Sequence, residues 1–321
     1  MVSLTELPAP LAAWSGSLTC YTAAVGDWLS DRVTSWWRPL LNGGPYLGLV
    51  PVGDRWRFDH TPRPLAPAAG LALHHGADPD EFVAALRGTV AAQPSVVVAG
   101  DVYHLPWQRG HQRWHAPHWF VLRPAGERWR VTDSLAMTTQ AGPQPARAVE
   151  LTTGELTRCA QALPAGDPVF ELRERSVLGT DRTGLGATYR WLSGAAPDAA
   201  DRPPVASAAQ SGAAACDALA ELLARHGHRP STYEVADDLW QAVRQRELLV
   251  AAGEVDPELL PPVGRAHWFG ALGRWRALPP LLLHARLRAQ DGVADPAAGA
   301  VELLRELARY EGRHLVPEAD A

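Results

Sequence analysis

The sequence contains no lysine, so all 30 of its basic side chains are arginines. Together with heavy use of alanine, glycine and proline, this bias is typical of a GC-rich bacterial genome and carries no information about function. The net charge is −5, the isoelectric point is near 6.2, and the arginines form no dense cluster. We therefore expect no nucleic-acid partner, because nucleic-acid binding proteins carry a basic patch or stripe.

Cysteine is scarce, with only Cys20, Cys159 and Cys216 in the chain. Their odd number and wide spacing predict neither a disulfide framework nor a CxxC-type zinc site. No uninterrupted apolar run approaches the ~20 residues of a membrane helix, so we expect no membrane partner. The first residues lack a basic region followed by an apolar core, which argues against a signal peptide. We expect a cytosolic, reduced protein with cytoplasmic localisation.

At 321 residues, 46% hydrophobic and 20% charged, the chain can fill one large core or two ordinary ones. The periodicity predicts an α+β unit with an antiparallel sheet over residues 1–155 and a mainly helical domain over 156–321. In the first part we expect a helix from residue 20 to 37 and another over 82–92, with strands at 48–50, 56–58, 96–99, 119–122 and 129–131. In the second part we expect a strand at 169–172, a loop or hinge at 194–204, and helices over 208–226, 232–252, 263–290 (broken at Pro279-Pro280) and 296–313.

Cys20 stands at the beginning of a helix-like run, Cys20-Tyr21-Thr22-Ala23-Ala24-Val25. An ordinary thiol has a pKa near ~8.5, and a helix N-terminus or a nearby imidazolium lowers it. A cysteine in this place is therefore a candidate nucleophile. The alternative is a buried structural thiol, since free cysteine is among the most buried residue types. We assign that structural role to Cys159 and Cys216, which have no comparable partners in the sequence.

A histidine and an aspartate open and close a predicted hairpin about a hundred residues later. His118 begins the apolar run to Leu122, Pro124 to Glu127 forms the turn, and Asp133 ends the second strand. The two strands of a hairpin bring residues some fifteen positions apart side by side. A histidine that takes and returns a proton, oriented by a carboxylate, completes the requirements of a thiol catalyst. Cys20, His118 and Asp133 are thus the predicted catalytic residues.

Other histidines compete for these roles. His115 is the alternative base, but it precedes Pro117 in a loop, whereas His118 begins the strand, so we favour His118. A metal site made from His104, His111, His115 and His118 would have irregular spacing and no accompanying acidic ligand motif. We therefore expect no metal and no cofactor. Asp133 and Asp101 could also be simple turn residues.

Three features of the chain resemble the butirosin biosynthesis protein H family. They are Cys20-Tyr21 on a helix, the segment Val97 to Trp107, and the pair His118 and Asp133. The most specific part is the pattern Asp-x-Tyr-x-Leu-Pro-aromatic at Asp101–Trp107, which thiol proteases in general do not require. The family's relatives also carry a mainly helical C-terminal domain, so the resemblance spans most of the chain.

This resemblance implies a papain-like fold used for acyl transfer in antibiotic biosynthesis. An acyl group would move from the phosphopantetheine thioester of an acyl carrier protein to Cys20, and then to a small-molecule amine. His118 would act as the base and acid, and Asp133 as the orienting carboxylate. Asp101, Tyr103, Trp107 and Trp119 would bind substrate or shape its channel. Trp119-Phe120 departs from the aliphatic residues expected after the histidine, which would narrow the pocket.

The oxyanion hole is less well defined by the sequence. The backbone N–H of Cys20 is one candidate donor, because helix N-termini leave such groups unpaired. The nearest side chains that could supply a second donor are Ser15, Ser17 and Thr19. Three further functions remain open: cyclisation or release of a carrier-bound chain, peptidase or amidase activity at the same triad, and a non-catalytic binding protein with an unreactive Cys20.

Overall fold

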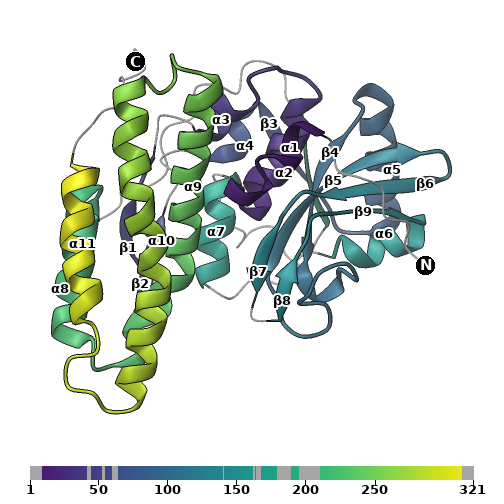
Figure 1. The fold of residues 1–321 in the computed structure, drawn as a ribbon. Coiled ribbons are helices and arrows are strands. Elements are labelled where there is room, and N and C mark those ends of the chain that lie inside the picture. Colours follow the sequence, from purple (N-terminus) through teal and green to yellow (C-terminus); the bar gives the residue numbers. More distant parts are fainter. Residues whose placement is uncertain are drawn as a thin grey trace. The chain divides into compact units, whose positions relative to one another are not determined.

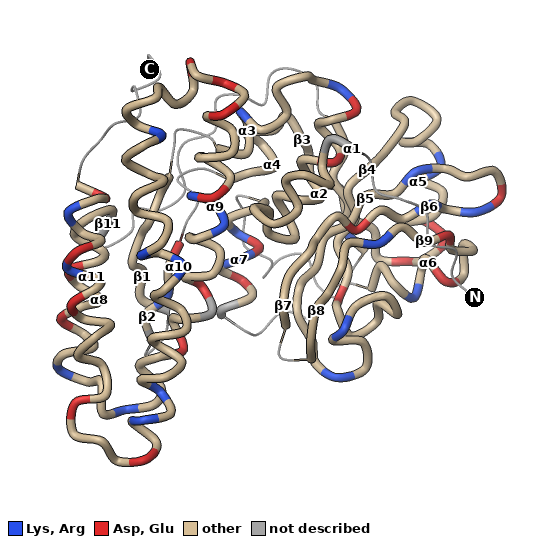
Figure 2. The backbone as a smooth tube through the Cα atoms, viewed as in Figure 1, with Lys and Arg blue, Asp and Glu red and all other residues tan. Residues whose placement is uncertain are grey.

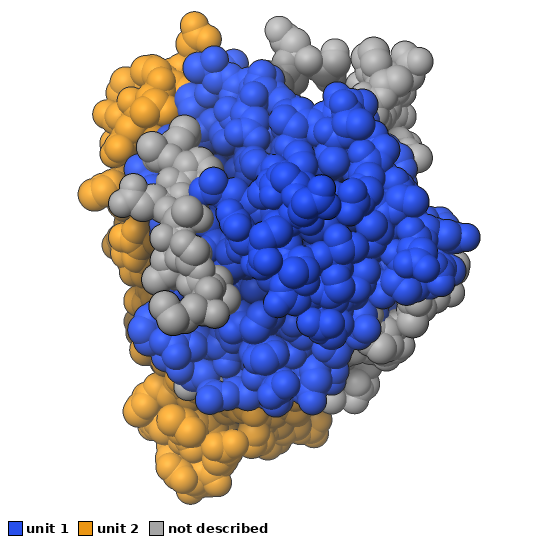
Figure 3. Space-filling view, turned by 90° about the vertical axis from the view of Figure 1, so that its right-hand side faces the viewer, with its two compact units in different colours: residues 1–40, 63–205 blue, residues 41–62, 206–321 orange. Residues whose placement is uncertain are grey.

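The computed structural model describes residues 9–41, 45–52, 55–59, 64–139, 141–161, 163, 168–178, 189–194 and 210–312. The chain forms two compact units, and each is discontinuous in sequence (Figure 1, Figure 3). Unit 1 comprises residues 1–40 and 63–205, and unit 2 comprises residues 41–62 and 206–321.

Unit 1 is built on a six-stranded antiparallel sheet with the strand order β3-β10-β4-β5-β6-β9. The central hairpin joins β5 and β6 through a turn in which Gly126 has a φ of 62°, a conformation that glycine adopts without strain. A small hairpin of β7 (Met137–Thr139) and β8 (Gly142–Gln144) follows β6. The strands of the large sheet are β3 (Leu71–Gly76), β4 (Val96–Asp101), β5 (Pro117–Ala125), β6 (Arg128–Asp133), β9 (Arg147–Leu151) and β10 (Tyr189–Gly194).

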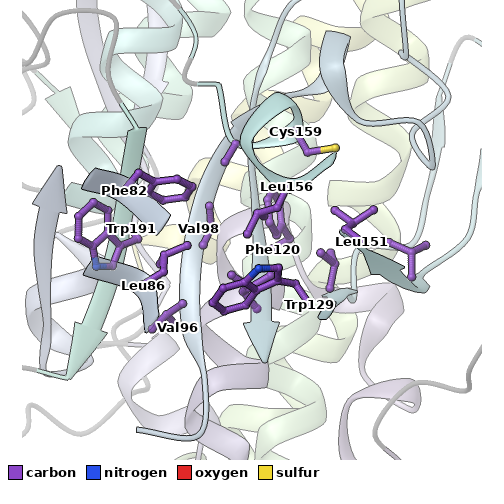
Figure 4. Packing of buried hydrophobic residues seen from close by; sticks show 14 of the residues in the cluster. Phe82, Leu86, Val96, Val98, Phe120, Trp129, Leu151, Leu156, Cys159 and Trp191 are labelled. Carbon is purple, nitrogen blue, oxygen red and sulfur yellow. The ribbon is translucent and has the colours of Figure 1, made fainter. Parts of the chain in front are cut away.

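Helices cover both faces of this sheet. Side chains alternate between the faces along a strand, and on one face Val98 and Phe120 pack in a buried apolar cluster with Phe82 of α5 and Leu156 of α6 (Figure 4). On the other face α2 contacts β4, β5 and β6. The remaining helices of unit 1 are short. The helices are α1 (Ala9–Ala12), α2 (Cys20–Ser30), α3 (Trp37–Leu41), α4 (Leu65–Ala68), α5 (Pro79–Ala92), α6 (Thr153–Cys159) and α7 (Pro168–Leu178).

A buried charge cluster joins α2 to the sheet. Arg123 of β5 donates to Asp27 and to Asp31 at 2.7 Å each, and Asp27 is fully buried. Burial raises the pKa of Asp27, although the Arg123 guanidinium opposes that rise. Because Arg123 lies on the face opposite Leu122, this ion pair fixes α2 on the second face of the sheet and so orients the helix that begins with Cys20.

Unit 2 combines four long helices with a small antiparallel sheet of order β11-β1-β2. A fully buried Arg246 donates to both carboxylate oxygens of Glu311 at 2.7 Å, and Trp275 Nε1 donates to the same carboxylate at 3.1 Å. This network links α9, α10 and α11. The elements are β1 (Gly48–Val52), β2 (Arg55–Asp59), β11 (Gln210–Ser211), α8 (Ala213–His226), α9 (Ala236–Val255), α10 (Pro262–Gln290) and α11 (Ala298–Glu311).

The predicted α+β class, with helices and an antiparallel sheet, is confirmed. The predicted strand at 169–172 is wrong, because this segment begins helix α7. The apolar run Val169-Phe170 looks like a strand, but Glu171 in the first turn and Arg175 in the last turn match the helix dipole. The predicted helix from 20 to 37 ends earlier, at Ser30.

Helix α10 is also not broken at its two prolines. It continues through Pro279 and Pro280 to Gln290, although proline removes a backbone donor and disfavours a helix interior. Trp275, Leu278 and Leu282 are buried on either side of the prolines, so packing of this face holds the helix together.

The compact units divide the chain differently from the division expected at residue 155. Strand β10 lies between β3 and β4 in the sheet of unit 1, and residues 41–62 supply β1 and β2 to unit 2. Residues 195–204 of the expected loop lie outside the described part of the chain. Among the described helices, none is both long and apolar enough to cross a membrane.

Candidate active site

Cys20 is the first residue of helix α2, as the sequence predicts. Thr19 is the N-cap, and a capping box joins it to Thr22: the Thr19 side chain accepts from the Thr22 N–H, and the Thr22 hydroxyl accepts from the Thr19 N–H at 2.7 Å. This reciprocal cap fixes the first turn. Cys20 is partly exposed, whereas Cys159 and Cys216 are buried. The thiol therefore stands at a well-formed helix N-terminus, where the macrodipole favours negative charge.

His118 and Asp133 lie at the same end of the sheet, on neighbouring strands. His118 Nε2 is 2.7 Å from Asp133 Oδ2, and both side chains are almost fully buried. The register of the hairpin favours this contact, because Val121 pairs with Thr132, so that Asp133 follows the last pair on β6 and His118 lies three residues before it on β5. His118, rather than His115, is therefore the histidine that meets Asp133.

The Cys20 thiol lies beside this pair, and its hydrogen-bonding and charge interactions help raise the pKa of the His118 imidazole. Since His118 Nε2 faces Asp133, Nδ1 is the ring nitrogen left for the thiol. Burial by itself lowers the pKa of His118, but the charge and hydrogen bond of Asp133, together with Cys20, outweigh it and raise the pKa to about 10. The imidazolium form is thus strongly favoured at neutral pH.

Asp133 is surrounded by N–H donors. Its Oδ2 accepts from His118, from Trp107 Nε1 at 2.8 Å and from Gln108 Nε2 at 2.5 Å. Its Oδ1 accepts from the Leu135 backbone N–H at 3.2 Å. Burial raises the pKa of Asp133, but the His118 charge and these hydrogen bonds outweigh it and hold the pKa below its usual range. The carboxylate therefore stays ionised next to the imidazolium.

Gln108 is the residue that sequence reasoning missed. Its Nε2 lies 3.1 Å from His118 Nε2 and donates to Asp133 Oδ2 at 2.5 Å. Because the His118 Nε2–H points at Asp133, the contact between the two nitrogens is close packing of two donors rather than a hydrogen bond. Gln108 directly follows Trp107 of the predicted motif, so its position beside the motif was the available signal.

A second glutamine holds the Trp107–Arg109 segment in place. Gln144 of β8 is buried; its Oε1 accepts from the Arg109 N–H at 2.8 Å, and its Nε2 donates to the Trp107 carbonyl at 3.3 Å. The loop after β4 is thus tied to the β7–β8 hairpin. These hydrogen bonds of Gln144 position Trp107 and Gln108, the two side chains of the loop that donate to Asp133.

Asp101 and Tyr103 form a separate arrangement with His115. Asp101 is buried at the end of β4; its Oδ1 accepts from the backbone N–H groups of Tyr103 and Ala116 at 3.1 Å each, and its Oδ2 contacts His115 Nδ1 at 2.5 Å. The rings of Tyr103 and His115 stack with centroids 4.4 Å apart. The His115 side chain is 55% exposed, so this second Asp–His pair is open to solvent.

The other predicted site residues are placed as follows. Trp107 contacts Asp133 and packs edge-on against Phe120. Trp119 follows His118 in β5 and is only 2% exposed. Burial raises the pKa of Cys159 to about 12 and also raises the pKa of Cys216. Both thiols therefore stay protonated at neutral pH.

The hydroxyls that could assist an oxyanion have other partners close by. The Thr19 hydroxyl is taken up by the helix cap, and the Ser15 hydroxyl donates to the Ala12 carbonyl. The Cys20 backbone N–H, at the first position of α2, remains the best-placed candidate donor. Within the described residues, no group of three or more histidines, cysteines and acids is arranged to hold a metal ion.

A thiol beside a hydrogen-bonded pair of a basic imidazole and a buried carboxylate supplies a nucleophile, a proton carrier and an orienting group. The sequence supplies these side chains from three elements, and the folded unit 1 brings all three together. No protein-family model matches the chain, and comparison with curated proteins gives no match.

Proposed function

We propose that the protein is a cysteine-dependent acyltransferase that forms an acyl-enzyme on Cys20. The observation that carries this proposal is the placement of Cys20 at a capped helix N-terminus, beside the hydrogen-bonded pair of His118 and Asp133. A buried structural thiol would need no imidazole beside it. A buried His–Asp pair that served only stability would not need a partly exposed thiol beside it.

The reaction would proceed in two steps, acylation of Cys20 and transfer of the acyl group to an amine. His118 holds the proton of the Cys20–His118 pair as the imidazolium, and the Cys20 thiolate attacks the carbonyl carbon of an acyl thioester. The bond to the leaving sulfur breaks, and the leaving thiolate takes the proton from the His118 imidazolium. An amine then attacks the acyl-enzyme, His118 accepts the amine proton and returns it to the Cys20 sulfur, and the amide product leaves.

Each neighbouring group has a defined part in this scheme. Asp133 keeps His118 in the orientation and protonation state needed for both proton transfers. The Cys20 backbone N–H is placed to donate to the oxyanion of the tetrahedral intermediate. Asp101, Tyr103, Trp107 and Trp119 would shape the acyl or acceptor channel.

The finer assignment follows the resemblance to the butirosin biosynthesis protein H family. On that basis the fold of unit 1 is papain-like, the donor is the phosphopantetheine thioester of an acyl carrier protein, and the acceptor is a small-molecule amine of bacterial specialised metabolism. The protein would act in the cytoplasm. The order Cys20, His118, Asp133 along the chain and the Asp101–Trp107 motif support this assignment.

The test is intact-protein mass spectrometry after incubation with a simple acyl thioester. Wild-type protein should gain one acyl group, Cys20→Ala should gain none, and His118→Ala should be acylated much more slowly. Cys216→Ala is the matched control, because it removes a buried thiol and should keep the adduct. If wild type gains no adduct and Cys20 also resists a small alkylating reagent, the thiol is structural and the proposal is wrong.

A further inference from the structure

The chain segments around the candidate site contain no acidic residue. Residues 9–26, 102–126 and 134–149 hold neither aspartate nor glutamate, although the whole chain has 35 acids in 321 residues and a net charge of −5. At the average density of the chain, stretches of this combined length would contain several acids. The absence is therefore a feature of these segments and not of the composition.

Parts of the three segments meet at one end of the unit 1 sheet. Strand β4 ends at Asp101, β5 begins at Pro117, β6 ends at Asp133, and β9 begins at Arg147, which is the register partner of Asp133. The loop after β4 is tied to β8 by Gln144. The segment 9–26 includes Cys20, whose thiol reaches His118.

Four arginines lie on these segments. Arg123 is paired with Asp27 and Asp31, and we call the other three, Arg109, Arg113 and Arg147, the arginine rim. Arg109 and Arg113 are exposed, and Arg147 is partly exposed. Arg109 Nε donates to the Pro143 carbonyl at 3.0 Å, which leaves its charge without a carboxylate. Among the described residues, none forms an ion pair with a rim arginine, whereas Arg123 and Arg128 on the same hairpin each have acidic partners.

The two acids at this end of the sheet do not cancel the rim. Asp101 and Asp133 are 1% exposed each and are fully engaged with His115 and His118. Figure 2 marks the acids in red and the arginines in blue along the backbone. The end of unit 1 that holds Cys20 therefore presents uncompensated positive charge in a protein that is acidic overall.

We infer that this end of unit 1, through the arginine rim, docks an acidic carrier protein that delivers the acyl thioester. The inference rests on the proposed function and names the surface that its donor would use. A protein partner fits better than a small phosphate, because the rim arginines are spread over two segments and none is buried. Charge complementarity of this kind raises association rates and selects partners.

The experiment compares three acyl thioester donors of the same acyl group: a neutral small thioester, a coenzyme A thioester and an acyl carrier protein thioester. The variant Arg109→Gln/Arg113→Gln/Arg147→Gln removes the rim. At about 50 mM salt, the ratio of kcat/KM for the carrier-protein donor to that for the neutral donor should fall about 10-fold. At about 500 mM salt the difference should shrink to less than about 3-fold, because salt screens exposed charges.

The matched control is Arg87→Gln, which removes an exposed arginine on α5 near Trp129, at the other end of β6. It should leave the donor ratio unchanged. If Arg87→Gln lowered the donor ratio as much as the rim variant does, the effect would come from net charge, and the inference would be overturned. If the rim variant lost as much kcat/KM with the coenzyme A donor as with the carrier-protein donor, the arginines would recognise a small phosphate, and the inference would also be overturned.

A direct binding measurement separates this inference from the proposed function. Fluorescence anisotropy with labelled acyl carrier protein should give a Kd about 10-fold weaker for the rim variant than for wild type at low salt. If Cys20 forms no acyl-enzyme but the carrier still binds through the rim, the proposed chemistry fails and the docking surface stands. If wild type and rim variant bind the carrier equally, the docking surface is refuted whatever the chemistry.

Discussion

Replacing Asp133 by asparagine tests how the site sets the charge of His118. The change keeps the shape of the side chain, removes the charge of Asp133, which is the strongest influence that raises the His118 pKa, and weakens the hydrogen bond between the two side chains. In wild type these influences, with Cys20, carry the pKa from its ordinary 6.5 to about 10. At about 1.4 kcal/mol per pKa unit, this rise means that the folded site stabilises the imidazolium over the neutral ring by on the order of 5 kcal/mol more than water does for an ordinary histidine.

In Asp133→Asn, burial still lowers the pKa of His118, and only the Cys20 interactions and the weakened hydrogen bond oppose it. We expect the His118 pKa to fall to near its ordinary value or below. Proton transfer from the thiol to His118 becomes about tenfold less favourable for each unit that the His118 pKa loses. Alkylation of Cys20 by iodoacetamide near pH 7 should therefore slow by about tenfold or more.

The assay is an NMR titration of the histidine ring nitrogens, with the His118 signal assigned by its loss in His118→Gln. Wild-type His118 should remain an imidazolium through pH 8 and lose its proton near pH 10. Asp133→Asn should lose it at or below neutral pH. Asp101→Asn is the control: it neutralises another buried carboxylate at the same end of the sheet, one that contacts His115 and not His118. An imidazolium that persists to pH 9 in Asp133→Asn would refute the reasoning.

The same pKa predicts how stability depends on pH. Because the folded pKa of His118 lies above its unfolded value, the His118–Asp133 pair contributes fully below about pH 6.5. That contribution declines as pH rises through about 10. Urea unfolding should show this decline in wild type, and Asp133→Asn should show a flatter profile over the same range.

Two further pairs of substitutions test the packing of each unit. Gly100→Ala should destabilise unit 1 by about 1–3 kcal/mol, because its Cβ would lie 2.5 Å from a backbone oxygen of α6, whereas Gly88→Ala in α5 meets nothing and should stabilise by about 0.5–1 kcal/mol in urea unfolding. Arg246→Met alone should destabilise unit 2 by about 3–5 kcal/mol by leaving Glu311 buried and unpaired; Arg246→Met/Glu311→Leu should recover most of that loss, and equal denaturation midpoints for the single and double variants would contradict this account.

The sequence was most informative where local signals coincide. The cap before Cys20 and the turn between His118 and Asp133 follow from short-range chemistry. Helix α2 begins at the predicted residue, and strands β5 and β6 begin within two residues of the predicted positions. Strand β10 was not predicted, because its partners β3 and β4 are about a hundred residues away and pairing across such distances leaves no local pattern. Segment 169–172 was assigned as a strand because four residues are too few to distinguish strand from helix.

The candidate site was predictable in part for the same reason. Cys20, His118 and Asp133 can be named from the ends of elements, but their contacts depend on α2 lying across the sheet. Gln108 could not be assigned from the sequence, because its role requires Gln144 to hold the loop against β8. A glutamine in a polar loop has many uses, and only the folded arrangement shows which atoms its amide meets.

The alternation of the two units along the chain has a consequence for how the protein can be made and divided. The chain enters unit 1, leaves it at residue 40, returns at residue 63 and leaves again at residue 205. No single cut separates the units, and a fragment ending at residue 155 would lack β10, the strand that connects β3 to the rest of the sheet. During synthesis, β1 and β2 must wait for more than 140 residues before β11 and the long helices of unit 2 emerge. Independent expression would therefore require a new connection between residues 40 and 63 for unit 1, and between residues 62 and 206 for unit 2.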